Sequence, residues 1–391
     1  MPRRRFGLHR ILAWPGQPLR RAEFGRNRPT HTKPDSECLL RRWCPRDNCT
    51  ELDIRSSAAA VISDSALRIK WAPETALNSP NARRAIQELG RSLTQAGFIN
   101  RFGRLQIDDE CNADLAELAL GKYIDVAVAA RFLGGPQSLV ALLETGLATI
   151  TEESRFSLAF EVLSDGKAMA ILPFLDSADD VPVDSVYAGA DTWLLRDQAW
   201  KYGLHGKRAI DLGTGTGLVA AFLTSRYETV VAADINQRAT QTAQLSRELL
   251  PDPAKSRIYV MTNDVAAGLR PGTFDFVCVN SPWVPAHRAV GRIYSQGGET
   301  GFELPRRFIL EGTELLAPGG TFIALCAELS FTDGSNPLRE LLDDLEHNGF
   351  ATFIEPTPAP HPFHTAADGT AETLPGLETA RHVTAVVQRN P

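Results

Sequence analysis

The 391-residue chain lacks any apolar run of about 18 residues, the length that a helix needs to cross a bilayer, so we expect no membrane-spanning segment. Its six cysteines are spread along the chain, unlike the dense framework of a disulfide-stapled miniprotein, and no Cys-x-x-Cys pair of the kind that binds zinc is present. The group formed by His31, Cys38, Cys44 and Cys49 lacks a metal-ligand spacing, and we expect no metal site. The N-terminus lacks the apolar core of a signal peptide, which favours a cytoplasmic protein.

Positive charge is scarce beyond the first 58 residues. Residues 1–58 hold 13 Lys/Arg and 6 Asp/Glu, whereas the whole chain has a net charge of -6. The remainder is therefore strongly acidic, which does not favour electrostatic binding of phosphate backbones over an extended basic surface. We expect a protein or a small molecule as the partner rather than a nucleic acid, although a small basic patch would still allow one.

Residues 1–57 read as a basic, Pro-punctuated tail that is disordered or an over-extended start; a transit peptide is the weaker alternative. Residues 58–176 read as an accessory domain in which helices precede a hairpin, with strands expected at 156–162 and 168–174 around Asp165-Gly166. This order predicts a small helical or winged-helix-like domain. This domain is expected to be an accessory without chemistry of its own, which packs on the rest of the chain or shapes the substrate site. The alternative is that its hairpin is a wing that reads nucleic acid. The expected helices are 81–98, 112–120, 122–133 and 136–146.

Strands and helices alternate from residue 185 to residue 391, after a linker at 175–185. The alternation predicts an α/β fold with a doubly wound, mostly parallel seven-stranded sheet. No helix separates the last two strands, so we expect them to be antiparallel. The expected strands are 208–212, 229–235, 257–262, 274–280, 321–327, 351–355 and 382–388.

A glycine-rich loop follows the first of these strands, in the run Asp211-Leu-Gly-Thr-Gly-Thr-Gly217. Glycines allow a ligand to approach the backbone closely, and an acid before the loop can accept the ammonium of an amino-acid group. Asp234 ends the next strand, where it can accept hydrogen bonds from two ribose hydroxyls. Asp264 ends the third strand, where a carboxylate can meet an adenine amino group. Three such features in order predict a nucleoside-containing cofactor.

The half of the chain from 185 to 391 resembles the class I S-adenosylmethionine-dependent methyltransferases. The resemblance implies S-adenosyl-L-methionine as the cofactor. The cofactor-binding residues that it implies are Asp211, Gly213, Thr214, Gly215, Gly217, Asp234, Ile235, Asn263, Asp264 and Asn280.

The fourth strand ends in Asn280-Ser281-Pro282-Trp283, which resembles the Asn-Pro-Pro-Tyr loop of methyltransferases that modify planar nitrogens. The lone pair of such a nitrogen is delocalised. An Asn oxygen and a backbone carbonyl can accept both N–H hydrogens and steer the lone pair toward the methyl group. An aromatic residue can stack on the flat acceptor. We therefore assign Asn280, Pro282 and Trp283 to catalysis, with a strand-ending Asn280 and a packing Trp283 as the alternatives.

Two further stretches are similar to the HemK-related release-factor glutamine methyltransferases. One begins at Val186-Tyr187, and the other is Gly297-Gly-Glu-Thr-Gly301 followed by two arginines. The first implies that Asp191 and Thr192, together with Trp283, contact the substrate. Ser281 and Trp283 depart from that family's loop, and Ala188-Gly189 from its Glu-Pro pair, at positions that line the acceptor pocket.

The sequence thus predicts a HemK-like N-methyltransferase that acts on a planar nitrogen, either an amide or an exocyclic amine, of a protein glutamine or a small molecule. Two alternatives remain open. One is a methyltransferase for rRNA or DNA bases, and the other is a non-catalytic cofactor-binding protein.

Overall fold

The computed structural model describes residues 71–101, 104–107, 112–174, 182–287, 289, 292–357 and 374–391. The basic tail 1–57, with its His and Cys group, and most of the predicted linker lie outside the described residues.

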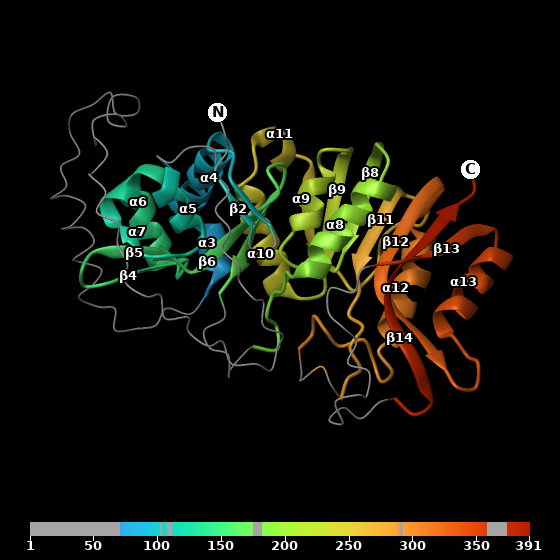
Figure 1. Ribbon diagram of the computed structural model, residues 1–391. Coiled ribbons are helices and arrows are strands. Elements are labelled where there is room, and N and C mark those ends of the chain that lie inside the picture. The colour runs from blue at the N-terminus through green and yellow to red at the C-terminus, as the bar shows by residue number, and fades with distance from the viewer. Residues whose placement is uncertain are drawn as a thin grey trace, which may run out of the picture.

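A seven-stranded sheet forms the C-terminal half, with strand order β10-β9-β8-β11-β12-β14-β13 (Figure 1). Neighbouring strands are parallel, except that β14 runs antiparallel to both β12 and β13. The doubly wound, mostly parallel sheet and its antiparallel closing strands are thereby confirmed. The strands are β8 (Gly206–Leu212), β9 (Tyr227–Asp234), β10 (Ile258–Thr262), β11 (Phe274–Asn280), β12 (Leu316–Phe331), β13 (Phe350–Pro356) and β14 (Leu377–Arg389).

Helices cover both faces of this sheet, because successive side chains of a strand point to opposite sides. The helices are α8 (Ala190–Tyr202), α9 (Leu218–Leu223), α10 (Gln237–Glu248), α11 (Asp252–Lys255), α12 (Glu303–Glu314) and α13 (Pro337–His347). Ala209 of β8 packs into a core shared with α8, α9 and α10, whereas its neighbour Ile210 packs into a second core with α12 and α13.

The N-terminal region combines short helices with two small antiparallel sheets of order β2-β1-β6-β7 and β3-β5-β4. Its helices are α3 (Pro73–Asn78), α4 (Pro80–Gln95), α5 (Ala113–Ala119), α6 (Val126–Phe132) and α7 (Pro136–Glu144). Its strands are β1 (Ile99–Arg101), β2 (Arg104–Gln106), β3 (Ile124–Asp125), β4 (Ala148–Ile150), β5 (Arg155–Leu158), β6 (Phe160–Ser164) and β7 (Met169–Pro173). Within the described ranges no single helix is long and apolar enough to cross a bilayer, and only the pair α6 and α7, bent by 100°, passes by length and composition.

The expected single strand at 156–162 is wrong. It is divided at Ala159 into β5 and β6, which belong to different sheets. The Ala159 N–H donates to the Leu147 carbonyl (2.9 Å), and its own carbonyl accepts from Phe174 N (3.1 Å). Both strands have buried residues, so the apolar pattern runs on through a bend that only the hydrogen bonds reveal.

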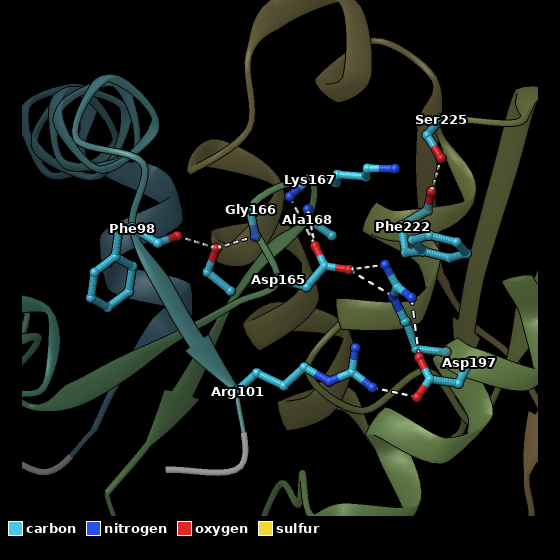
Figure 2. A network of polar contacts seen from close by, with 11 residues as sticks. Phe98, Arg101, Asp165, Gly166, Lys167, Ala168, Asp197, Phe222 and Ser225 are labelled. Carbon is cyan, nitrogen blue, oxygen red and sulfur yellow. Dashed lines mark hydrogen bonds and ion pairs between the residues drawn. The ribbon is translucent and has the colours of Figure 1, made fainter. Parts of the chain in front are cut away.

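The N-terminal region is joined to the sheet domain by a continuous apolar core and by the polar network of Figure 2. Asp165, in the β6–β7 turn, accepts from Arg196 Nε of α8 (2.6 Å) and from two N–H groups of its own turn. Arg196 also bonds Asp197 (3.1 Å), and Asp197 in turn pairs with Arg101 of β1. The Arg196 guanidinium lies 4.3 Å from the centre of the Phe222 ring. The hairpin formed by β6 and β7, which we call the N-terminal hairpin, therefore holds helix α8 at its middle.

Candidate functional site

A cavity of about 310 Å³ lies where β8, β9, β10 and β11 reach their carboxyl ends, the edge at which doubly wound sheets bind ligands. Its lining comes from the β8–α9 loop, the ends of β9, β10 and β11, the segment before α8, the loop after β11 and helix α12. Among the predicted residues, those that line it are Thr192, Asp211, Gly213, Thr214, Gly215, Asp234, Ile235, Asn263, Asp264, Asn280 and Pro282. A larger hollow of about 560 Å³, beside Pro271 and Arg389, holds none of the predicted residues.

The glycine loop leaves one side of the cavity open. Gly213 adopts φ +67°, and a Cβ built on it would meet only the Phe308 ring, at 4.0 Å. Gly217 serves a different purpose, because a Cβ there would lie 3.1 Å from Ala243 of α10. It lets the start of α9 pack on α10, and it is not among the lining residues of the described chain.

Asp211 is buried and turned into this loop. Its Oδ2 accepts from Thr214 Oγ1 (2.7 Å) and Ala220 N (3.2 Å), and Cys278 Sγ lies 3.7 Å from Oδ1. Burial raises the pKa of the Asp211 carboxyl to about 7. A cation bound in the cavity would favour its ionised form.

Asp234 stands at the end of β9 and is tied to two backbone groups. Its Oδ2 accepts from Gly215 N and its Oδ1 from Asn236 N, both at 2.9 Å. Burial raises the pKa of this carboxyl, and these N–H groups lower it in part. A carboxylate has about four acceptor positions, so two remain for ribose hydroxyls. Ile235, 58% exposed, lines the cavity beside it.

Asn280, at the end of β11, has one half of its side-chain amide paired and, within the described chain, the other half unpaired. Its Nδ2 donates to Asp191 Oδ2 (3.0 Å), at the start of α8. Its Oδ1 is buried and has no hydrogen-bond partner among the described residues. Buried amide oxygens normally have a partner, so this acceptor is available to a ligand donor.

Asp191 is held so that it can orient Asn280. It accepts the Thr192 N–H (3.0 Å) and hydrogen-bonds the Tyr187 side chain. Burial first, and then the Asp191 carboxylate, raise the pKa of Tyr187 above its ordinary range. A Cβ on Gly189 would lie 1.8 Å from the Tyr187 hydroxyl, so this glycine makes room for it. Asp191 itself is not among the lining residues of the described chain.

The structure places Trp283 away from the cavity lining formed by the described residues. Its ring meets His382 of β14 edge-on, with centroids 5.9 Å apart, and packs against the second core. Ser281 is likewise turned to the sheet, because its hydroxyl donates to the Leu325 carbonyl (2.8 Å). The aromatic rings that line the cavity are instead those of Phe308, Tyr187 and Tyr294, and the two tyrosine rings stack with centroids 5.0 Å apart and an interplanar angle of 8°.

Several lining residues, among them Tyr294 and Arg307, have no assigned role in the sequence analysis. Arg307 Nη1 contacts Asp264 Oδ1 (2.7 Å). The only sequence signal for Arg307 is its position after the Gly297–Gly301 run, and for Tyr294 its position after the Asn280 loop. Within the described part of the chain no group of three or more His, Cys, Asp or Glu is placed to hold a metal ion.

The chain is similar to known methyltransferases. Residues 192–346 match the family described as the methyltransferase small domain. A release factor glutamine methyltransferase of Koribacter versatilis is 29% identical over 34% of this chain. A tRNA1(Val) (adenine(37)-N6)-methyltransferase of Bacteroides fragilis is 31% identical over 39% of this chain and 69% of its own length. The chain spans about half the length of the release factor methyltransferase.

Among solved structures, the Mtq2–Trm112 complex of E. cuniculi matches over 53% of this chain and 99% of the matched chain, with 23% identity and a TM-score of 0.36.

Proposed function

The chain belongs to the class I S-adenosylmethionine-dependent methyltransferases, and from this premise we propose that it methylates a planar nitrogen, either an amide or an exocyclic amine. When bound, S-adenosylmethionine supplies a methyl group on a positively charged sulfur. The acceptors that we propose are a glutamine side chain of a protein or a small molecule.

The observation that carries this proposal is the buried, unpartnered Oδ1 of Asn280. Asp191 accepts from the Asn280 NH₂ group, which fixes the amide with its oxygen as the free end. A free oxygen can only accept, so the substrate group must carry an N–H or O–H donor. An oxygen that accepts an N–H hydrogen there fixes the orientation of the nitrogen and directs its lone pair toward the methyl group.

The cavity residues fit the cofactor. Gly213 leaves the loop open to a ligand, and the carboxyl-bearing residues Asp211 and Asp234 line the same cavity. We propose that Asp211 faces the ammonium group, that Asp234 and Ile235 hold the ribose, and that Asp264 meets the adenine. Thr214, Gly215 and Asn263 complete this side of the cavity.

A second candidate acceptor is the exocyclic amine of adenine in RNA. It is favoured by the Bacteroides fragilis relative, whose name states adenine N6 methylation of tRNA. The same Asn280 geometry would serve it, since adenine N6 is also a delocalised nitrogen with two N–H hydrogens. The acidic balance of the chain beyond residue 58 weighs against RNA.

Labelled methyl transfer separates these acceptors. The full chain is incubated with methyl-labelled S-adenosylmethionine and fractionated cell extract, and the label is followed after protease or ribonuclease treatment. Protease-sensitive label that yields N5-methylglutamine, or label in the low-mass fraction, supports the proposal. Ribonuclease-sensitive label on adenine supports the second candidate. Cofactor binding with no label in any fraction would favour a non-catalytic protein.

A further inference from the structure

The chain makes a strained turn directly after β10, at the end of the cavity proposed for adenine. Val265 has φ +49°, a left-handed conformation that β-branched residues rarely adopt. Asn263 Nδ2 donates to the Val265 carbonyl (2.9 Å), and Ala266 N donates to Glu311 Oε2 (3.2 Å). Such a conformation persists only where surrounding contacts stabilise it, and here the two hydrogen bonds hold the turn in its strained conformation.

Arg307 connects the same turn to helix α12. Its Nη1 donates to Asp264 Oδ1 (2.7 Å) and its Nε to Glu311 Oε1 (2.6 Å). Glu311 therefore holds both the arginine and the Ala266 N–H, one through each oxygen. We call Asp264, Arg307 and Glu311 the α12 clamp.

The α12 clamp does little for overall stability. The side chains of Asp264, Arg307 and Glu311 are 47%, 40% and 32% exposed, and ion pairs this exposed contribute little to folding. Both Asp264 and Arg307 line the cavity, however. The consequence of the clamp is therefore positional, since it sets where the Asp264 carboxylate stands relative to a ligand.

We propose that Arg307 and Glu311 are positioning residues that let the protein select an adenine ring through Asp264. Arg307 occupies Oδ1 of Asp264 and turns Oδ2 toward the exocyclic amine, from which it accepts a hydrogen bond. This inference rests on the proposed cofactor binding but does not depend on the methyl acceptor. It differs from a role in which Arg307 merely lies over the ring face, because stacking does not distinguish an amine from a carbonyl at that ring position.

The test compares two ligands by calorimetry on the full chain: S-adenosylhomocysteine, and S-inosylhomocysteine, in which a carbonyl oxygen replaces the amine. We expect the wild type to prefer the adenine form by about tenfold or more, because the analogue turns an acceptor toward a carboxylate. Arg307→Gln should weaken binding of the adenine form by about tenfold and leave binding of the inosine form nearly unchanged. Glu311→Ala should act in the same direction.

Arg306→Gln is the matched control, because Arg306 is an exposed neighbour on the same helix and its variant should keep the full preference. Arg307→Lys should give an intermediate preference, since a lysine can reach only one of the two carboxylates, and it carries the test if Arg307→Gln does not fold. Equal weakening of both ligands in the Arg307 variants, or an unchanged preference, would overturn the inference. Failure of the wild type to bind either ligand would overturn it together with the cofactor placement, whereas a wrong methyl acceptor would alter neither affinity.

Discussion

At the scale of single residues, the Asn280 amide shows how one hydrogen bond determines what a neighbouring atom can do. An amide can rotate by half a turn and exchange its donor with its acceptor. Asp191 can only accept when ionised, so it holds the NH₂ group and leaves Oδ1 for the ligand. The chemistry of the site therefore depends on Asp191 as well as on Asn280.

Asn280→Ala should lower turnover by about two to three orders of magnitude, by analogy with the loss of a preorganised transition-state hydrogen bond. Cofactor affinity should change little, because the free oxygen serves the acceptor. The measurements are label transfer and calorimetry, with circular dichroism as the folding check. Asn348→Ala, at an exposed helix end, is the control. A folded Asn280→Ala enzyme with normal turnover would refute the planar-nitrogen mechanism.

The variants Trp283→Ala and Tyr294→Ala should impair different properties, the first stability and the second substrate binding. Trp283→Ala removes a half-buried ring from the contact with His382 and should lower the free energy of unfolding by about 2 kcal/mol. Tyr294→Ala, which removes an aromatic face at the cavity, should raise the acceptor KM with less effect on stability. Denaturant melts and steady-state kinetics measure these effects. A raised KM in a fully stable Trp283→Ala protein would instead support the stacking role predicted from the sequence.

The Asp211 carboxyl makes cofactor binding depend on pH. Its folded pKa of about 7 lies above the unfolded value of about 4, so the folded state holds the proton more tightly. The contribution of Asp211 to the free energy of unfolding is therefore present below pH 4 and is lost as the pH rises through 7. A cationic ligand favours the ionised form, so cofactor affinity should rise with pH in this range.

Calorimetry at pH 5.5 and 7.0 should show affinity rising several-fold for the wild type, below the limit of about tenfold per pH unit for one group. In Asp211→Asn the rise should be reduced. A residual slope is assigned to Asp234, whose pKa burial also raises. An identical slope in the variant would show that Asp211 does not meet the ammonium group.

At the scale of elements, α8 joins two functions along one helix. Its first turn carries Asp191 and Thr192 at the site, and its middle carries Arg196, which the N-terminal hairpin holds through Asp165. Asp165 and Arg196 are only 3% and 13% exposed, so this ion pair is largely removed from water. The hairpin therefore holds the helix that orients Asn280.

Asp165→Ala should lower the free energy of unfolding by about 3 kcal/mol, because it leaves a mostly buried guanidinium without its main partner. Glu117→Ala breaks the Glu117–Lys122 pair, in which both side chains are 47% exposed, and should cost less than about 1 kcal/mol. Urea melts of the two variants compare these values. Equal losses would show that the hairpin contact is no stronger than an ordinary surface pair.

The elements also show where sequence reasoning succeeds. Strands β8 and β11 contain the apolar stretches Ala209-Ile210 and Phe276–Val279, and a polar residue of the cavity, Asp211 or Asn280, follows each stretch. Both the strands and these polar residues can therefore be predicted from the sequence. Helix α8 is not predicted, because its apolar residues, including Trp193 and Leu195, do not keep to one face. They pack partly on the sheet and partly on the N-terminal region. The contact of Trp283 with His382 joins residues about a hundred positions apart, which no local pattern reveals.

At the scale of the whole molecule, the N-terminal region and the sheet domain share one apolar core. Ile171 N of β7 donates to Ser246 Oγ of α10 (2.8 Å). A Cβ on Gly90 of α4 would lie 2.0 Å from the carbonyl oxygen of Leu249, so at this glycine the backbones of the two regions are in direct contact. We expect them to unfold together, because separating them would expose apolar surface on both sides.

Two truncations test this expectation. Removal of residues 1–57 should shift the melting temperature by less than about 2 °C and leave cofactor affinity unchanged, because that sequence lacks the periodic apolar face that docking requires. Removal of residues 1–174 takes away the partner of α10 and the hairpin that holds α8, and should give an aggregating or partly unfolded protein. Scanning calorimetry with S-adenosylhomocysteine titration follows both proteins. A well-folded, ligand-binding 175–391 fragment would show that the sheet domain is independent of the shared core. A large loss of stability on removing 1–57 would show that the basic segment contributes contacts of its own.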